Sequence, residues 1–145
     1  MAKISWDTES VALPSLDYEK IQEWIVRVAG NHERVVGRLG YLLCDDEVML
    51  AANRQYLGHD YYTDIITFDY SHGERISGDM IISLDTVRSN ADAVGETYRR
   101  ELLRVIIHGV LHLCGINDKG PGEREIMEAH EEAALALVNV DECFT

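Results

Sequence analysis

The sequence predicts an α+β fold, in which helices pack on one small mixed β-sheet of about four strands. Three observations support this prediction. Short segments rich in β-branched and aromatic residues alternate with longer segments whose apolar residues recur at helical spacing. One long segment, 102–113, is apolar on nearly every side, so we expect a buried central helix there. No repeat or linker divides the 145 residues, which are expected to form a single domain, 1–145.

The first half of the chain is expected to contain a strand, a helix, a second strand and a second helix. The first helix is predicted because its apolar residues fall on one face. The second strand is predicted from a mostly apolar run, and the acidic pair that follows it, Asp45 and Asp46, is typical of a helix N-cap. These elements are expected at Lys3–Trp6, Asp17–Val28, Val35–Cys44 and from Glu47 to about Tyr56.

The second half is expected to contain a β-hairpin followed by three helices. Its first strand, Thr63–Tyr70, is rich in β-branched and aromatic residues. A polar loop, Ser71–Ser77, is expected to connect it to the strand Asp79–Leu84. The three helices are expected to start at Ser83 or Asp85, at Glu96 or Thr97, and at Pro121-Gly122-Glu123, and the first and last of them to end near Gly95 and Val138. On the last helix the expected apolar face is Ile126, Met127, His130, Ala133, Ala134 and Leu137.

Two histidines on the buried helix are the strongest functional signal in the sequence. His108 and His112 are four residues apart, so both imidazoles lie on one helix face. Placing two imidazoles in an apolar helix costs free energy unless each finds a partner, and a divalent metal uses both at once. A purely structural explanation is also open, because a core histidine is often simply hydrogen-bonded and such a pair also arises by chance.

A third metal ligand is predicted just beyond the helix. Gly115 can adopt the left-handed conformation that ends a helix, and the chain then turns back over the helix end. Asp118 follows six residues after His112, and its carboxylate is a better zinc ligand than the neutral amide of Asn117. Three protein ligands leave the fourth position of zinc for water, which is the layout of a catalytic site.

Composition and charge limit the compartment and the partners. The three cysteines have no paired spacing, which favours a reducing compartment over a disulfide framework. The N-terminal segment lacks the apolar region of a signal peptide, and no run is long enough to span a bilayer. We therefore expect a cytoplasmic chain with no membrane partner. The net charge of −13 repels phosphate backbones at long range, so a nucleic-acid substrate would need a metal, a basic patch or a partner that presents it.

Four blocks of sequence match, in order, the motifs of a known family. The pattern H-G-x-L-H-L-x-G-x-D-H is matched from His108 to Gly115, and the region that contains all four blocks runs from Val35 to Leu137. The other blocks are Asn53, Tyr56 and Asp60 with Thr63-Asp64-Ile65-Ile66-Thr67-Phe68, then Gly78-Asp79-Met80, and last Glu123 with Met127. With these motifs the chain resembles the bacterial YbeY family, rRNA maturation factors described as zinc-dependent endoribonucleases.

The resemblance implies a zincin-like arrangement in which the central helix binds one Zn²⁺ per chain, with another divalent transition metal as an alternative. The implied ligands are His108, His112 and Asp118. The family has a histidine at the third of these positions, and a carboxylate can replace it as a zinc ligand. A second departure is Leu57, which stands where the family commonly has an arginine.

The function that the resemblance implies is metal-dependent cleavage of single-stranded RNA. The expected role is maturation of the 3′ end of small-subunit rRNA and ribosome quality control, with the small subunit or a ribosome-associated protein as partner. His108 and His112 are the expected catalytic residues, together with Arg104, whose cation could stabilise the negative charge of the transition state. Either water or the 2′-hydroxyl of the substrate could attack the phosphorus.

Residues outside this set have weaker claims. Arg99 and Arg100 are further candidate cations, although both are also explained as a solvated helix start. His59 could act as a general acid, and Asp64 could orient a ligand histidine. An exposed loop histidine and a strand-start hydrogen bond explain these two equally well.

Two other functions compete with the nuclease. The chain could be a non-catalytic ribosome assembly factor with a structural metal, which the acidic charge and Leu57 favour. It could also be a zinc metalloprotease, because the helix resembles the H-E-x-x-H layout. In that layout the catalytic glutamate follows the first histidine, and here the position is Gly109, so the general base of peptide hydrolysis is missing.

Overall fold

The computed structural model describes residues 2–59 and 63–145 and contains one four-stranded mixed sheet. The spatial order of the strands is β1-β2-β4-β3. Strands β1, β2 and β4 are parallel to one another, whereas β3 pairs antiparallel with β4 at the edge. The strands are β1 (Lys3–Glu9), β2 (Val35–Cys44), β3 (Ile65–Asp69) and β4 (Arg75–Ser83).

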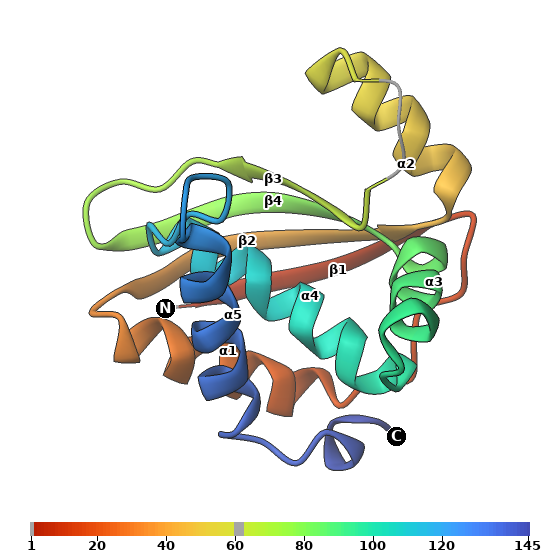
Figure 1. Cartoon of the computed structure of the whole chain (residues 1–145). Helices are drawn as coiled ribbons and strands as arrows, with labels where there is room; N and C mark the ends of the chain where they lie inside the picture. The colour runs from red at the N-terminus through yellow and green to blue at the C-terminus, as the bar shows by residue number, and fades with distance from the viewer. Residues whose placement is uncertain (1, 60–62) are drawn as a thin grey trace.

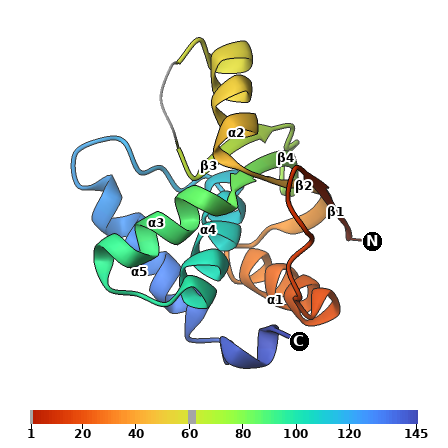
Figure 2. The ribbon, with the colours of Figure 1, turned by 90° about the vertical axis from the view of Figure 1, so that its right-hand side faces the viewer.

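The helices divide unequally between the two faces of the sheet (Figure 1). Four of them gather on one face, and α2 stands on the other, an arrangement that the view turned by 90° in Figure 2 also shows. The first group is α1 (Tyr18–Asn31), α3 (Leu84–Val94), α4 (Tyr98–Leu113) and α5 (Glu123–Leu135). The opposite face carries α2 (Asp46–Ala52), which continues into the π-helix η1 (Asn53–Leu57), and a 3-10 turn, η2 (Asp141–Cys143), lies near the C-terminus.

Alternation along the strands builds two apolar clusters. On β2, Leu39, Tyr41 and Leu43 belong to the main core, which the sheet shares with α1 and α4. The buried Tyr41 hydroxyl donates a hydrogen bond to the Ile106 carbonyl of α4 over 3.0 Å, which ties the central strand to the central helix. A smaller cluster on the opposite face joins Cys44, Met49, Ala52, Ile66 and Ile81.

Helix α4 is the buried centre of the molecule, as its apolar sequence predicts. It begins where the Thr97 hydroxyl accepts a hydrogen bond from the Arg100 N–H over 3.2 Å. It ends at Leu113, and Gly115, just past the Cys114 C-cap, has a φ of 96° in the left-handed region. There the Gly115 N–H bonds the His112 carbonyl at 3.0 Å and the Ile116 N–H bonds the Leu111 carbonyl at 3.1 Å, which is a Schellman turn.

The expected fold class, strand number and element order are confirmed, with differences at the boundaries. Strand β1 runs to Glu9, because it pairs in register with β2 as far as Cys44. Strand β4 begins at Arg75, inside the segment expected as a loop, because reciprocal backbone hydrogen bonds between His72 and Arg75 make the turn tighter. Strand β3 starts only at Ile65, and Asp60 of the second motif block lies outside the described residues.

No helix in residues 2–59 and 63–145 is both long and apolar enough to span a bilayer.

Candidate functional site

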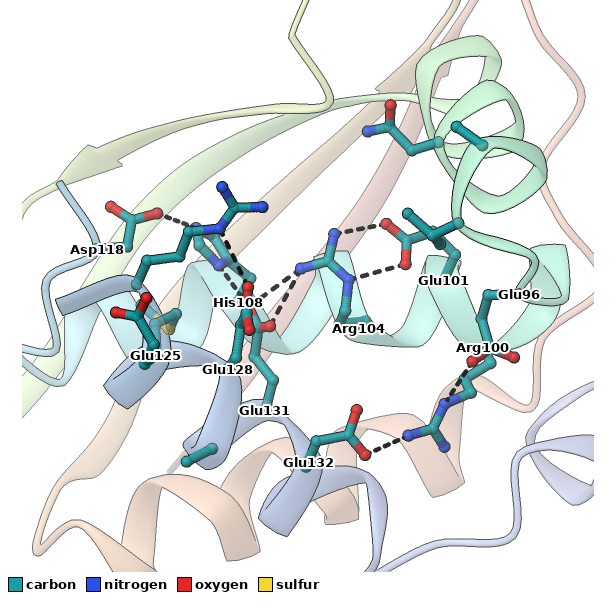
Figure 3. Close-up of a pocket in the computed structure, with 16 residues that line it drawn as sticks. Glu96, Arg100, Glu101, Arg104, His108, Asp118, Glu125, Glu128, Glu131 and Glu132 are labelled. Atoms are coloured by element: carbon teal, nitrogen blue, oxygen red, sulfur yellow. Dashed lines mark hydrogen bonds and ion pairs between the residues drawn. The ribbon is translucent and has the colours of Figure 1, made fainter. Parts of the chain in front are cut away.

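A groove of about 870 Å³ lies over α4, between α3 and α5 (Figure 3). Its floor is formed by one side of α4, where Glu101, Arg104 and His108 follow one another at helical spacing. Asp118, from the turn after α4, and Glu131, from α5, approach the same side chains. The groove therefore gathers charged residues from both sides of the Schellman turn.

His108 is held between two carboxylates. Its Nδ1 lies 2.6 Å from Oε2 of Glu131, and its Nε2 lies 3.4 Å from Oδ2 of Asp118. Burial by itself would lower the pKa of His108. The hydrogen bond and negative charge of Glu131, with the charges of Asp118 and Asp64, outweigh burial, so the pKa of His108 lies above its ordinary value.

Arg104 joins two buried glutamates one turn before His108. Its Nε donates to Glu101 over 2.8 Å, and a terminal nitrogen contacts both oxygens of Glu131 at 3.1 and 3.2 Å. The side chains of Glu101 and Glu131 are only 5% and 3% exposed. The hydrogen bond to Glu101 is the main reason why the pKa of Arg104 is raised, so this residue stays a cation.

Asp64 completes the cluster from the segment just before β3. Its carboxylate lies 3.6 Å from Arg104 and accepts a hydrogen bond from the Asn90 amide of α3 over 3.4 Å. Burial raises the pKa of Asp64, although the positive charge of Arg104 acts in the opposite direction. Asp64 thus pairs with Arg104, whereas the carboxylate hydrogen-bonded to His108 is that of Glu131.

The predicted metal ligands are brought together only in part. Ligand atoms that share a tetrahedral zinc at 2.0–2.1 Å lie roughly 3.3 Å apart, and Nε2 of His108 and Oδ2 of Asp118 are 3.4 Å apart. This imidazole–carboxylate pair fits zinc in type and in spacing. His112 follows one turn later but does not line the groove. Within residues 2–59 and 63–145, no group of three His, Cys, Asp or Glu side chains is arranged to hold a metal ion.

The other predicted cations lie outside the His108 cluster. Arg100 pairs with Glu96 and Glu132 at the far end of the groove, and Arg99 pairs with Asp141 on the surface. Arg104 does lie next to His108 on the groove floor, but its nitrogens are engaged by three carboxylates. His59 is exposed at the end of η1 and does not line the groove.

Sequence reasoning missed the two buried glutamates. The expected face of α5 was wrong in part, because Ile126 is 54% exposed and Ala133 is exposed, whereas Glu131 is 2% exposed. The available signal was spacing: Glu131 lies four residues after Met127 and three before Ala134, both of which are buried. A glutamate on that face indicates a buried ionic partner, which here comes from α4.

The fold and the groove define a small α+β domain whose central helix presents an imidazole to carboxylates from the following turn and helix. Residues 3–139 match the model of a protein family described as endoribonuclease YbeY. The chain belongs to this family, and the resemblance inferred from the four motif blocks is confirmed.

Curated relatives support the same assignment at high identity. The chain is 61% identical over 137 residues to a protein of Phocaeicola vulgatus, which covers 94% of this chain and 99% of that one. It is 58% identical over 134 residues to a protein of Bacteroides thetaiotaomicron, with coverages of 92% and 98%. A protein of Parabacteroides distasonis is 55% identical over 140 residues, with coverages of 97% and 98%. All three bear the name endoribonuclease YbeY.

A solved structure supports the fold. The solution structure of TM1509 from Thermotoga maritima superposes with a TM-score of 0.65 at 25% sequence identity. The match covers 94% of this chain and 91% of that one, so the similarity extends over nearly all of both chains.

Proposed function

We propose that the chain, as one domain over residues 1–145, is a metal-dependent endoribonuclease that cuts single-stranded RNA in the cytoplasm. Its role would be maturation of the 3′ end of small-subunit rRNA and ribosome quality control, in contact with the small subunit or a ribosome-associated protein. Family membership supports the RNA substrate. The observation that supports the location of the active site is the position of His108, between Glu131 and Asp118 in the groove.

The proposed ligands of one Zn²⁺ are His108, His112 and Asp118, with another divalent transition metal as the alternative. The type and spacing of the His108–Asp118 pair support this proposal. Because the three-ligand group is not assembled in the described chain, His112 would have to join the other two on binding. When bound, the ion would supply Lewis acidity toward a phosphoryl oxygen.

Electrostatics also support metal dependence. Among the described residues that line the groove, seven carboxylates face three arginines. RNA phosphates are repelled by such a surface unless a cation offsets it. Arg104 is already neutralised by its own carboxylate partners, so it is poorly suited to bind phosphate. We therefore assign it to the support of the site, in place of the catalytic role expected from the sequence.

The direct test is RNA cleavage by the purified full chain, with and without added zinc, on matched single-stranded and duplex substrates. His112→Ala and Asp118→Ala are the test variants, and His72→Ala is the control because His72 is exposed in the β3–β4 turn. We expect zinc-dependent cleavage of the single strand, lost in both test variants and kept in the control. Metal content of the same preparations should fall in the test variants, and equal zinc and equal activity in all four proteins would contradict the ligand proposal.

A second candidate, the non-catalytic assembly factor, is favoured by one observation. Leu57, at the position where the resemblance expects an arginine, is an exposed apolar residue with 44% of its surface accessible. Absence of cleavage in every metal condition, with retained binding to small ribosomal subunits, would select this function.

The metalloprotease receives no support from the groove. Gly109 is buried, and a Cβ at this position would lie 3.0 Å from Met80 and 3.1 Å from Ile65. A glutamate at this position would have to displace both of these side chains, and the chain has no general base there.

A further inference from the structure

We infer that Glu131 is the positioning residue for His108, and that Arg104 and Glu101 hold it in place. In this arrangement Glu131 selects the imidazole tautomer with its proton on Nδ1 and directs Nε2 toward Asp118. The inference deepens the proposed function, because His108 is the central residue of the proposed site. It assigns a role to Glu101 and Arg104 of α4 and to Glu131 of α5, which lies 27 positions after Arg104 and meets it only in the fold.

The geometry supports a single orientation of the imidazole. Oε2 of Glu131 is 2.6 Å from Nδ1 of His108, a short contact typical of a charge-assisted hydrogen bond. A carboxylate can only accept there, so Nδ1 must carry the proton. Nε2 is then the nitrogen that faces Asp118, 3.4 Å away, and the groove. A carboxylate that binds one imidazole nitrogen fixes both the tautomer and the direction of the other nitrogen.

Glu131 is itself fixed from the opposite side. One terminal nitrogen of Arg104 contacts both of its oxygens, and the rest of the guanidinium is bound by Glu101 at 2.8 and 2.5 Å. Arg104 therefore cannot turn without losing bonds to two buried carboxylates. The guanidinium is planar, so binding both glutamates also fixes the plane in which Glu131 meets His108.

This arrangement is costly for a purely structural device. Two glutamates that are nearly fully buried share one arginine, although apolar residues of similar size would usually serve stability as well or better. Asp64 is the alternative orienting carboxylate, but its side chain contacts Arg104 and Asn90. Glu131 touches the imidazole and lies behind it relative to Asp118, which is why we call it a positioning and not a catalytic residue.

The test is the tautomer of His108 in the metal-free full chain, read by long-range ¹H–¹⁵N correlation of the imidazoles. The sample is treated with chelator and kept at alkaline pH, where imidazole is neutral, and a His108→Gln variant assigns the signals. We expect the Nδ1–H tautomer in the natural sequence. Glu131→Leu should convert it to a mixture or to Nε2–H, because the acceptor is gone. Glu132→Leu, the same change one position along the helix, should leave the tautomer unchanged, since Glu132 pairs with Arg100.

Kinetics of RNA cleavage provide a second readout that a packing defect would not reproduce. For Glu131→Leu we expect kcat to fall by about 10- to 100-fold with little change in KM, the range found when a carboxylate behind a ligand histidine is removed. An Nε2–H tautomer in the natural sequence would overturn the inference even if Glu131→Leu failed to fold. An unchanged tautomer in a folded Glu131→Leu protein would overturn it as well. Neither result depends on whether the natural chain cuts RNA, so the proposed function is tested separately.

Discussion

Arg104 is the residue on which the charged cluster depends. Its guanidinium lies between Glu101 and Glu131, and it is the cation that allows two carboxylates to be buried beside an imidazole. Leaving a buried carboxylate without its partner costs far more than the net gain from forming the pair. The stability of the groove should therefore be much more sensitive to Arg104 than to Arg99 and Arg100 of the same helix, whose acidic partners are far more exposed.

We predict that Arg104→Met destabilises the protein by about 3 kcal/mol, because two buried carboxylates lose their common partner. Arg100→Met is the matched control, one turn earlier on α4, and its more exposed ion pairs with Glu96 and Glu132 should be worth less than about 1 kcal/mol. Urea unfolding at neutral pH measures both. Similar losses in the two variants would show that the buried pairs add nothing beyond a surface interaction.

At the scale of elements, the close approach of the β3 backbone to β4 depends on a glycine. Gly78 on β4 pairs with Asp69 of β3, and a Cβ on Gly78 would lie 2.5 Å from the Phe68 carbonyl oxygen. A side chain there would push the edge strand away. Among the helices, the C-terminal end of α1 meets α5 through side chains, in the edge-to-face contact of His32 and His130.

Gly78→Ala is predicted to destabilise the protein by about 1–3 kcal/mol, because the added methyl group can be accommodated only by moving the backbone of β3. Gly30→Ala provides the control, since no atom lies within 4 Å of a Cβ at that helical position. That change should be neutral or stabilising by up to about 1 kcal/mol, because alanine is the better helix former. Thermal unfolding of the two variants should move in opposite directions from that of the natural sequence.

The contact between His32 and His130 predicts a pH dependence. Burial lowers the pKa of His32, and the charges of His130 and Arg34 lower it further. The unfolded chain then takes up the proton first, so this contribution to stability is present above the ordinary histidine pKa of about 6.5 and is lost as the pH falls through and below it.

The measurement is the urea midpoint at about pH 8 and about pH 5.5, which bracket the histidine value. The pKa of His108 is raised, so His108 stabilises the folded state at low pH and opposes the effect of His32. The contribution of His32 must therefore be read from the difference in urea midpoint between the variant and the natural sequence. Relative to the natural sequence, His32→Gln should gain stability on acidification. If the urea midpoints of the two proteins differed by the same amount at both pH values, protonation of His32 would not contribute to the pH dependence of stability.

For the molecule as a whole, the net charge of −13 is the main property outside the groove. Mutual repulsion of this many carboxylates disfavours the compact state and is screened by salt. The same charge delays the approach of RNA, so productive binding has to rely on the site itself or on a partner.

Added salt is accordingly predicted to stabilise the chain. Raising NaCl from about 0.05 to 0.5 M shortens the screening length several-fold, and the urea midpoint should rise. A variant in which four exposed glutamates become glutamine, Glu19, Glu23, Glu33 and Glu142, should show a smaller rise. Equal salt responses would mean that repulsion does not contribute to stability.

Sequence patterns predicted the local structure and the two facing groups, His108 and Asp118, because these depend on spacing along one helix and its end. The order of strands and the ionic support of the imidazole could not be predicted in the same way. Glu101 and Glu131 are 30 positions apart, and charged residues are assigned to solvent until a tertiary partner is known. The predicted apolar face of α5 was wrong in part for this reason, because Glu131 occupies a buried position on that helix.

The turn at Gly115 has a consequence for whatever binds in the groove. Two main-chain hydrogen bonds hold the chain there, only a few residues before Asp118. The backbone that leads to this carboxylate is thus fixed by the fold, close to the imidazole. A ligand that binds both the Asp118 carboxylate and the His108 imidazole therefore finds them partly preorganised. Less of its binding free energy is spent on ordering these two groups.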